Sequence, residues 1–531
     1  QHRSRLRSAL TREHVTVRAC SARALWAVLR RRARPETFHY PREMRGNSIR
    51  RALILIACGA AGAALIGIAP GAAASDRGVA SRSTTLDIDE CKPRVQANFG
   101  FVEIGFTDRA NRVPSRGTVK VATVFVDFPD SRAKVGASSY FDSFVPQGLG
   151  MIEGYSYGRV QFAVTRPDRW FTLPKPSTDY AYSRGMTGEG HHELIADAVA
   201  IADPFMDFSG ASAVIVVMPP DLPGSNYEVS PAFVSDPSLT VNADGARIMN
   251  GTTIGTDAPH MRPQVLAHEI LHTMGLIDLY HPITRPEDFE LQFKYTGPFS
   301  SMSNIGGLAP ELFAWERWVL DWIDDGQSHC LGAGSHDITL DSVALPTKGS
   351  KLAVVPRGGT EYLTLEARTR DGRDSRGFAG VLPYVVDPSI PTSQGALRVP
   401  SQPGPQQVMM PLPVGSAVAI EGIGIEVLRS TGSGFETRVH VPAPGPTTPG
   451  PVGQLRIGMT LGGLLARWSA PLQTGWTSTT GYEYRISNGP WMRTTDTSVR
   501  VTQSKKSRVF QVRAVNAVGP GQPSTASVRP R

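Results

Sequence analysis

The segment from Val265 to His281, which reads VLAHEILHTMGLIDLYH, constrains the fold of this chain more than any other part. His268 and His272 are four residues apart, so on a helix both imidazoles project from one face, one turn apart. Glu269 follows the first histidine, which gives the HExxH arrangement of zinc hydrolases whose glutamate acts as a base. A helix whose polar groups are confined to such a face has to be buried. The other positions of this predicted helix are apolar: Leu266, Ile270, Leu271 and Met274.

The residues after His272 supply candidates for a third metal ligand. Gly275 follows His272 by three residues, and a glycine there can end the helix in a left-handed turn. The chain then folds back and presents Asp278 to the same ion, because a carboxylate oxygen is an acceptable zinc ligand. This spacing resembles that of the metzincin group, with aspartate in place of the usual third histidine. We expect Asp278 to be the third ligand, with His281 and Glu287 as alternatives, and a metal-free core helix as the remaining interpretation.

The rest of the chain divides by composition. A nearly continuous β-branched run from Val119 and a second at Ala213–Met218 predict buried strands, and the stretch between them has helical periodicity. This alternation predicts an α/β (α+β) domain within residues 75–330, which also hold a short N-terminal segment. Residues 331–440 consist of short alternating runs broken by Gly and Pro, which predicts an all-β sandwich. Residues 441–451 are a Pro-rich linker, so the chain is multidomain.

Most of the positive charge lies at one end of the chain. The formal charge is +8, but residues 1–74 hold 14 Arg and 3 acidic residues, which leaves 41 basic and 44 acidic residues elsewhere, a net charge of −3. That balance argues against nucleic-acid binding. Residues 44–74 have a positive n-region, an apolar run and an Ala-rich cleavage site, which predicts a signal peptide and secretion. We interpret residues 1–43 as an upstream extension; a cytoplasmic tail before a membrane anchor, or a lipoprotein attached at Cys58, are the alternatives, and we expect no stable membrane association.

Two cysteines lie outside the N-terminal segments that we expect to be removed. In an exported protein, Cys91 and Cys330 are expected to form a disulfide. A free Cys91 thiol that caps the zinc ion is the alternative, because thiolates bind this metal well.

The last segment, residues 452–531, resembles a fibronectin type III domain. Trp468 matches the buried tryptophan of the second strand, and the stretches from Gly481 and Phe510 match the third and sixth strands. Arg508 stands where the family usually has its corner tyrosine. Such modules bind ligands or separate other domains and do not catalyse reactions. This one is a candidate for binding a surface or a polymer.

From about Val119 to Asp387 the chain resembles the immune-inhibitor-A-like family of secreted bacterial metallopeptidases. The stretches that carry the resemblance include VKVATVFVDFPD, DFSGASAVIVV, HEILHTMGLIDLY, PFSSMSNIGGLAPELFAWERWVLDWI and YLTLEARTRDG. The resemblance implies a metzincin-like catalytic domain in which His268, His272 and Asp278 bind one zinc ion and Glu269 is the catalytic base.

The resemblance also assigns Met302, in SSMSN, to the turn beneath the metal. A methionine that fills a gap in the core is the alternative. Some metzincins place a zinc-binding tyrosine two residues after this methionine, where this chain has Asn304, so the oxyanion stabiliser stays unassigned. Calcium is left open as a second cation.

These features predict a zinc-dependent endopeptidase that acts on proteins or peptides. An extended substrate is expected to pair with an edge strand, for which Ala213–Met218 is the candidate. The alternatives are a catalytically silent binding protein that uses its two β-modules, and a zinc hydrolase with a non-protein substrate. Three tryptophans at helical spacing are expected to pack in the core, with a carbohydrate platform as the alternative: Trp315, Trp318 and Trp322.

Overall fold

The computed structural model describes residues 83–95, 102–257, 260–282, 291–305, 310–401, 409–441, 445, 448–460, 463–471, 479–502 and 506–528. The chain divides into two compact units, residues 1–77 and 78–531, and all described residues belong to the second. The predicted upstream extension (1–43) and signal peptide (44–74), and Glu287, lie outside the described residues. None of the described helices is long and apolar enough to cross a membrane.

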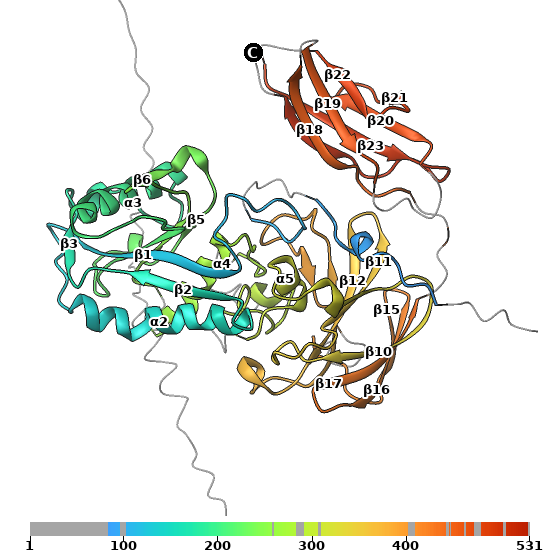
Figure 1. The fold of residues 1–531 in the computed structure, drawn as a ribbon, viewed down its shortest axis with the longest axis horizontal. Coiled ribbons are helices and arrows are strands. Elements are labelled where there is room, and N and C mark those ends of the chain that lie inside the picture. Colours follow the sequence, from blue (N-terminus) through green and yellow to red (C-terminus); the bar gives the residue numbers. More distant parts are fainter. Residues whose placement is uncertain are drawn as a thin grey trace, which may run out of the picture. The chain divides into compact units, whose positions relative to one another are not determined.

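A six-stranded sheet forms the first part of the described chain (Figure 1). Its order is β2-β1-β4-β8-β5, and β3 pairs with the end of β1. All pairs are parallel except β5 with β8, which is antiparallel. The strands are β1 (Gly117–Asp127), β2 (Val160–Thr165), β3 (Trp170–Thr172), β4 (Ala213–Val217), β5 (Ala232–Phe233) and β8 (Gly251–Ile254).

The prediction of a substrate-pairing edge strand at Ala213–Met218 is wrong. β4 lies inside the sheet, with β1 on one side and β8 on the other, and all five of its residues are buried. A strand that is apolar at every position has both faces covered, which is the environment of a central parallel strand. The antiparallel edge of this sheet is β5, which is only two residues long.

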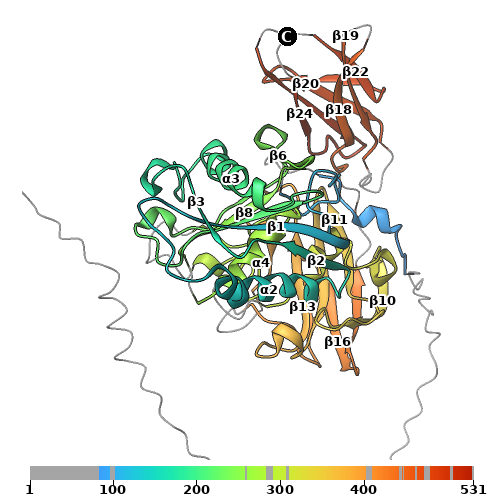
Figure 2. The same ribbon diagram turned by 60° about the vertical axis from the view of Figure 1, so that its left-hand side comes forward.

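Helices cover both faces of this sheet. The side chains of Val121 and Phe125 in β1 belong to one buried cluster with α2 and α4, whereas Val124 belongs to a second cluster with α3. Figures 1 and 2 show α2 and α3 on opposite sides of β1. The longer helices are α2 (Ala137–Tyr155), α3 (Gly188–Ala202), α4 (Arg262–Thr273) and α5 (Ala314–Val319).

The short elements complete this part of the chain. They are the hairpin strands β6 (Val241–Ala243) and β7 (Ala246–Ile248), and the 3-10 helices η1 (Ile88–Cys91), η2 (Ser177–Asp179), η3 (Asp203–Phe205), η4 (Ser225–Tyr227), η5 (Pro237–Leu239), η7 (Asp325–Gln327) and η8 (Gly372–Asp374).

A β-sandwich follows. One sheet has the order β14-β13-β12-β11-β9 and the other β10-β17-β16-β15, and a buried apolar cluster contains side chains of both. The first sheet consists of β9 (Ser328–Cys330), β11 (Leu352–Gly358), β12 (Glu361–Arg368), β13 (Gly380–Val386) and β14 (Leu397–Arg398). The second consists of β10 (Gly334–Asp341), β15 (Ala417–Ile420), β16 (Ile423–Ser430) and β17 (Gly434–Val441).

The hydrophobic core continues across the boundary that we placed at residue 330. β9 lies before that boundary but pairs with β11, and Tyr362 and Tyr384 of the sandwich belong to the same buried cluster as Trp315. The sandwich therefore shares one core with the part of the chain that contains α4. We call these two parts together, the described residues from 83 to 441, the body. The three tryptophans of the α5 region pack in this core as expected, each 0–1% exposed: Trp315, Trp318 and Trp322.

The predicted disulfide between Cys91 and Cys330 is present, with the two Cα atoms 5.8 Å apart. It ties the segment that precedes β1 to β9. Backbone hydrogen bonds at the same place, from Thr84 to Ala333 and from Leu86 to Cys330, continue this attachment.

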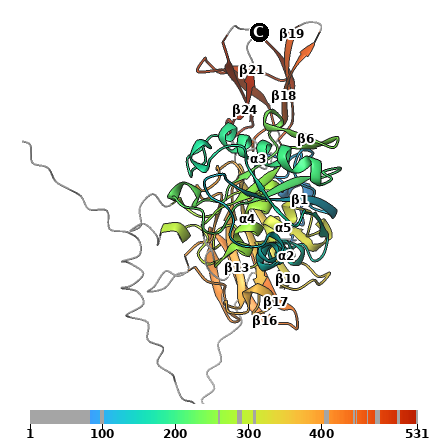
Figure 3. The same ribbon diagram turned by 90° about the vertical axis from the view of Figure 1, so that its left-hand side faces the viewer.

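The last described segment contains two further sheets, of order β18-β19-β22 and β21-β20-β23-β24 (Figure 3). Trp468 and Phe510 belong to its own buried cluster. Arg508, at the position of the missing corner tyrosine, donates a hydrogen bond to the Thr502 carbonyl, so a guanidinium makes a backbone contact there. The strands are β18 (Gly453–Thr460), β19 (Gly463–Ser469), β20 (Gly481–Ile486), β21 (Met492–Thr494), β22 (Ser498–Val501), β23 (Arg508–Val515) and β24 (Ser524–Val528).

Candidate metal centre

Helix α4 carries the HExxH motif and ends as the sequence predicts. Gly275 has φ +105°, a left-handed conformation that favours glycine. A Cβ atom at this position would lie 2.7 Å from the Arg112 side chain, so the close packing of Arg112 also requires a glycine. Leu276 N–H then bonds the Leu271 carbonyl at 3.1 Å, which turns the chain back toward the helix.

Three potential ligand atoms meet beside α4. His268 Nε2 lies 3.0 Å from His272 Nε2 and 3.0 Å from Asp278 Oδ1, and His272 Nε2 lies 3.2 Å from the same oxygen. In the described part of the chain, these three residues are the group of His, Cys, Asp and Glu side chains whose geometry suits a metal ion. The structure thus brings together the two histidines and the aspartate that the sequence predicts.

Hydrogen bonds on the other ring nitrogens decide what these atoms can do. His268 Nδ1 lies 3.2 Å from the Ser301 carbonyl, and His272 Nδ1 lies 2.8 Å from the Leu276 carbonyl. Because a carbonyl oxygen only accepts, each neutral imidazole carries its proton on Nδ1 and turns the Nε2 lone pair toward the other two ligand atoms.

Two imidazole lone pairs and a carboxylate oxygen then face one another. Their mutual repulsion is removed when all three atoms bind one cation. Ligands at about 2.0–2.1 Å from a tetrahedral zinc ion lie about 3.3 Å from one another. The separations of 3.0–3.2 Å are close to that value, so the residues fit a zinc ion with a fourth position left open.

A loop of the β-sandwich holds Asp278 in place. The Asp278 N–H donates to Thr392 Oγ1 at 3.0 Å, and Ser393 N–H donates to the Asp278 carbonyl at 2.9 Å. The alternative ligand His281 is not in the group: its ring packs edge-on against Tyr295, at 5.8 Å between centroids. No local pattern predicts the contribution of residues 392–393, because they lie more than 100 positions away from Asp278.

The charges at this centre are strongly coupled. Burial raises the pKa of Glu269 to about 8, and the charge on His272 opposes this. Burial acts to lower the pKa of His272, but the Asp278 carboxylate outweighs burial and raises that pKa to about 9. In the protonated state of the imidazoles, which excludes a metal ion, burial acts to raise the pKa of Asp278, but the charge on His272 and hydrogen bonds from both imidazoles hold it well below its ordinary value.

Glu269 lies on the same face of α4 as the two histidines and is 9% exposed. Edge strand β5 packs against α4, and the backbone of Ala232 acts to lower the pKa of Glu269, although burial outweighs it. The glutamate is thus placed between the ligand group and the edge of the sheet.

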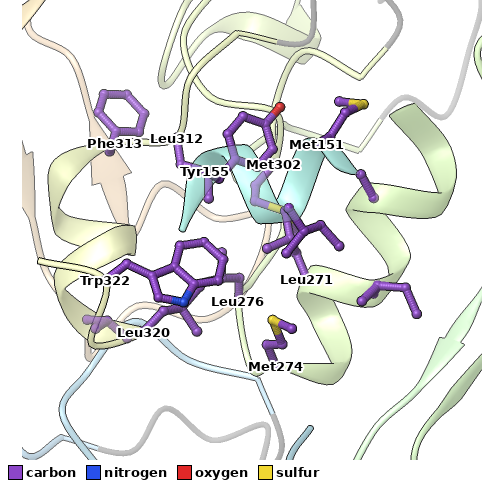
Figure 4. Close-up of a cluster of buried hydrophobic side chains, with 14 of the residues drawn as sticks. Met151, Tyr155, Leu271, Met274, Leu276, Met302, Leu312, Phe313, Leu320 and Trp322 are labelled. Atoms are coloured by element: carbon purple, nitrogen blue, oxygen red, sulfur yellow. The ribbon is translucent and has the colours of Figure 1, made fainter. Parts of the chain in front are cut away.

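Met302 is buried beneath the ligand group. Figure 4 shows it among the side chains of Tyr155, Leu271 and Met151, where α2 and α4 pack together. Its carbonyl accepts from Leu279 N–H at 3.0 Å, and the adjacent Ser301 carbonyl is the partner of His268. The side chain of Met302 therefore fills the core, while the backbone of residues 301–302 contacts His268 and Leu279.

Tyr280 is a further residue at this centre, and the sequence analysis assigned it no role. Its ring centroid lies 6.2 Å from that of His268, and burial, followed by the negative charges of Asp278 and Glu269, raises its pKa well above the ordinary value. The available signal was its position two residues after Asp278, which places its phenol beside a predicted ligand.

Comparison with known proteins finds only partial similarity. No protein-family model and no curated protein matches the chain. Among solved structures, the twitchin kinase region from C. elegans is 22% identical over 16% of this chain and 17% of its own length, with a TM-score of 0.14. A structure named FN3tt mut is 24% identical over 15% of this chain and 96% of its own (TM-score 0.14), and a human fourth FNIII domain is 15% identical over 16% and 82% (TM-score 0.14). These weak matches resemble fibronectin type III modules and do not bear on the metal centre.

Proposed function

We propose that this protein is a secreted zinc-dependent endopeptidase of the immune-inhibitor-A-like, metzincin type. One observation carries the proposal: the Nε2 atoms of His268 and His272 and Oδ1 of Asp278 converge within 3.2 Å, with both Nδ1 atoms bonded to carbonyl oxygens. Such a donor set binds zinc and leaves a position for water.

His268, His272 and Asp278 would hold the zinc ion, which when bound would supply an acidified water and polarise the scissile carbonyl. Glu269, in its ionised form, would accept a proton from that water and pass it to the leaving amine. Its burial, at 9% exposed, keeps bulk water away from the carboxylate during this transfer. Tyr280 lies beside these ligands, with its ring centroid 6.2 Å from that of His268.

β5 is the strand best placed to receive a substrate. It is the edge of the six-stranded sheet and packs against α4, the helix that carries Glu269. An extended peptide that pairs with such an edge presents its backbone to the neighbouring side chains. This strand replaces Ala213–Met218 as the substrate-pairing strand in the proposal.

The test compares casein hydrolysis and zinc content for the wild type and Glu269→Gln. The substitution keeps the size of the side chain and removes the base, so we expect about one zinc per chain and a rate lowered by about 10²–10⁴-fold. Glu193→Gln, on the exposed surface of α3, is the matched control and should keep full activity. A wild type that binds zinc and cleaves neither casein nor a peptide library would overturn the peptidase proposal and favour a non-protein substrate. Absence of zinc from the purified protein would overturn the metal centre and favour the catalytically silent binding protein.

A further inference from the structure

The two parts of the chain after residue 74 carry opposite charge. Residues 75–451 hold 30 basic and 42 acidic residues, a net charge of −12. Residues 452–531, the C-terminal module, hold 11 basic and 2 acidic residues, a net charge of +9. The balance of −3 over the whole of residues 75–531 conceals this division.

Three arginines of the module share one face of the sheet β18-β19-β22. Arg456 lies directly opposite Arg467 in the pairing of β18 with β19, and Arg500 of β22 lies opposite Leu465, two residues from Arg467. All three arginines are exposed. Because side chains alternate along a strand, these residues point away from the buried cluster that Ala466 and Trp468 join. We call these three residues the arginine face.

The module holds only two acidic residues, Glu483 and Asp496. Arg456 and Arg467 form no hydrogen bond or ion pair within the described residues of the module. Glu483 is engaged on the other sheet, where it pairs with Arg493 at 3.1 Å and with Arg513 at 2.8 Å. Like charges placed directly opposite each other on a sheet destabilise it. The pairing of Arg456 with Arg467 therefore lowers the stability of the module when no ligand is bound.

The arginine face is also hollowed. An open depression of about 380 Å³ is bordered by Arg456 and Arg467 and by the neighbouring cross-strand pair of Gly458 and Leu465. Its one aromatic neighbour among the described residues, Trp468, is only 5% exposed and belongs to the core. The surface therefore offers charge and shape, but no exposed ring on which a nucleobase stacks.

We propose that the arginine face binds a linear, phosphate-bearing polyanion, such as an anionic polymer of a cell surface. Guanidinium groups bind phosphate through paired N–H donors, and repeated phosphates match arginines spread along one face rather than gathered in one pocket. The neutralisation of the opposed Arg456 and Arg467 by such a ligand removes their repulsion. This inference does not depend on the proposed function, because it involves neither the metal nor peptide cleavage.

The test measures binding of inorganic polyphosphate by the wild type and by the double variant Arg456→Gln/Arg467→Gln. We expect affinity to fall about 10- to 30-fold at low salt, and the slope of log K against log salt to decrease by about 1.4. The matched control is Arg429→Gln/Arg438→Gln, which removes the same charge from exposed sandwich arginines that are paired with Glu436 and Asp337. This control should bind as the wild type does.

Thermal unfolding of the double variant provides the check on folding, and its midpoint should be unchanged or higher. Equal loss of affinity in test and control variants would show that overall charge is responsible, and would overturn the proposal. No binding of polyphosphate by the wild type would overturn it as well. Tighter binding of oligo(dT) or of heparin than of polyphosphate at equal charge would reject the phosphate polymer as the occupant.

Discussion

Arg368 and Arg467 are both arginines on β-strands, yet their surroundings are opposite. Arg368 in β12 has a side chain only 1% exposed and bonds Glu366 at 2.5 Å and Asp374 at 2.9 Å. Arg467 in β19 is exposed and faces another arginine. The comparison shows that the body gives the buried Arg368 two carboxylate partners, whereas the C-terminal module leaves Arg456 and Arg467 without any among its described residues. The buried ion pairs favour one packing of the core, and the exposed arginines are available to bind an anionic ligand.

The buried charges of the body also support the metal centre. Glu316 of α5 accepts hydrogen bonds from Ser300 Oγ at 2.7 Å and from Phe313 N–H at 2.8 Å, and Ser300 is two residues before Met302. Glu366 accepts from the Ala314 N–H at 2.6 Å. The sandwich and the segment beneath the ligand group are thus joined through one polar network.

The largest expected effect comes from opening this network. Arg368→Met leaves Glu366 buried without its cation, so we expect a loss of about 3–5 kcal/mol in the free energy of unfolding of the body. Arg438→Met, a half-exposed arginine of the same sandwich, should change it by about 1 kcal/mol or less. Denaturant titration followed by tryptophan fluorescence measures both. Similar small losses for the two variants would mean that the buried network does not hold the body together.

The disulfide is the next largest contribution. It closes a loop of 239 positions, so Cys91→Ser/Cys330→Ser should lower the stability of the body by about 2–5 kcal/mol. The unfolding of the C-terminal module should not change, because both cysteines lie outside it. Calorimetry of the wild type and the double variant checks this, and an equal shift of every transition would contradict the separation of the two regions.

The third prediction concerns His191, whose charged form is disfavoured by burial in the body. His191 is 3% exposed and lies 2.8 Å from Thr253 Oγ1, and burial, followed by repulsion from His192, lowers its pKa to about 4. Between pH 6.5 and pH 4 the unfolded chain binds a proton that the folded chain does not, so stability falls as pH falls through this window, by about 3 kcal/mol in total. His191→Gln should flatten the pH dependence of the unfolding midpoint, and His440→Gln, at an exposed position, should leave it unchanged. An unaltered pH profile in His191→Gln would contradict the assignment.

The smallest effect has the opposite sign. Arg456→Gln removes the cross-strand repulsion with Arg467 and should raise the stability of the C-terminal module by about 0.2–1 kcal/mol. Removal of a positive charge is therefore expected to stabilise the module but destabilise the body. The unfolding midpoint in low salt measures the gain, which should shrink as salt is added. A clear loss of stability would show that Arg456 has a structural role.

Local sequence patterns predicted the parts of the centre that are built locally. His268, His272, Gly275 and Asp278 lie within 11 positions of one another, so helical spacing and one left-handed glycine suffice to bring them together. The continuous β-branched run of β4 indicated a strand buried on both faces, and this signal contradicted its placement at an edge.

Contacts between distant segments could not be predicted in this way. The anchoring of Asp278 by Thr392 and the continuity of the core across residue 330 depend on tertiary packing, which periodicity does not report. The opposite charges of the body and the C-terminal module were visible in the sequence, but a single sum over residues 75–531 concealed them.

X-ray absorption at the zinc edge of the purified protein tests the central claim most directly. The proposed centre predicts one zinc per chain, with two imidazole nitrogens and oxygen donors at about 2.0–2.2 Å and no sulfur. His272→Ala should lose most of the bound zinc. A sulfur ligand, a third imidazole, or protein that contains no zinc after growth in zinc-replete medium would contradict the claim that His268, His272 and Asp278 form the metal centre.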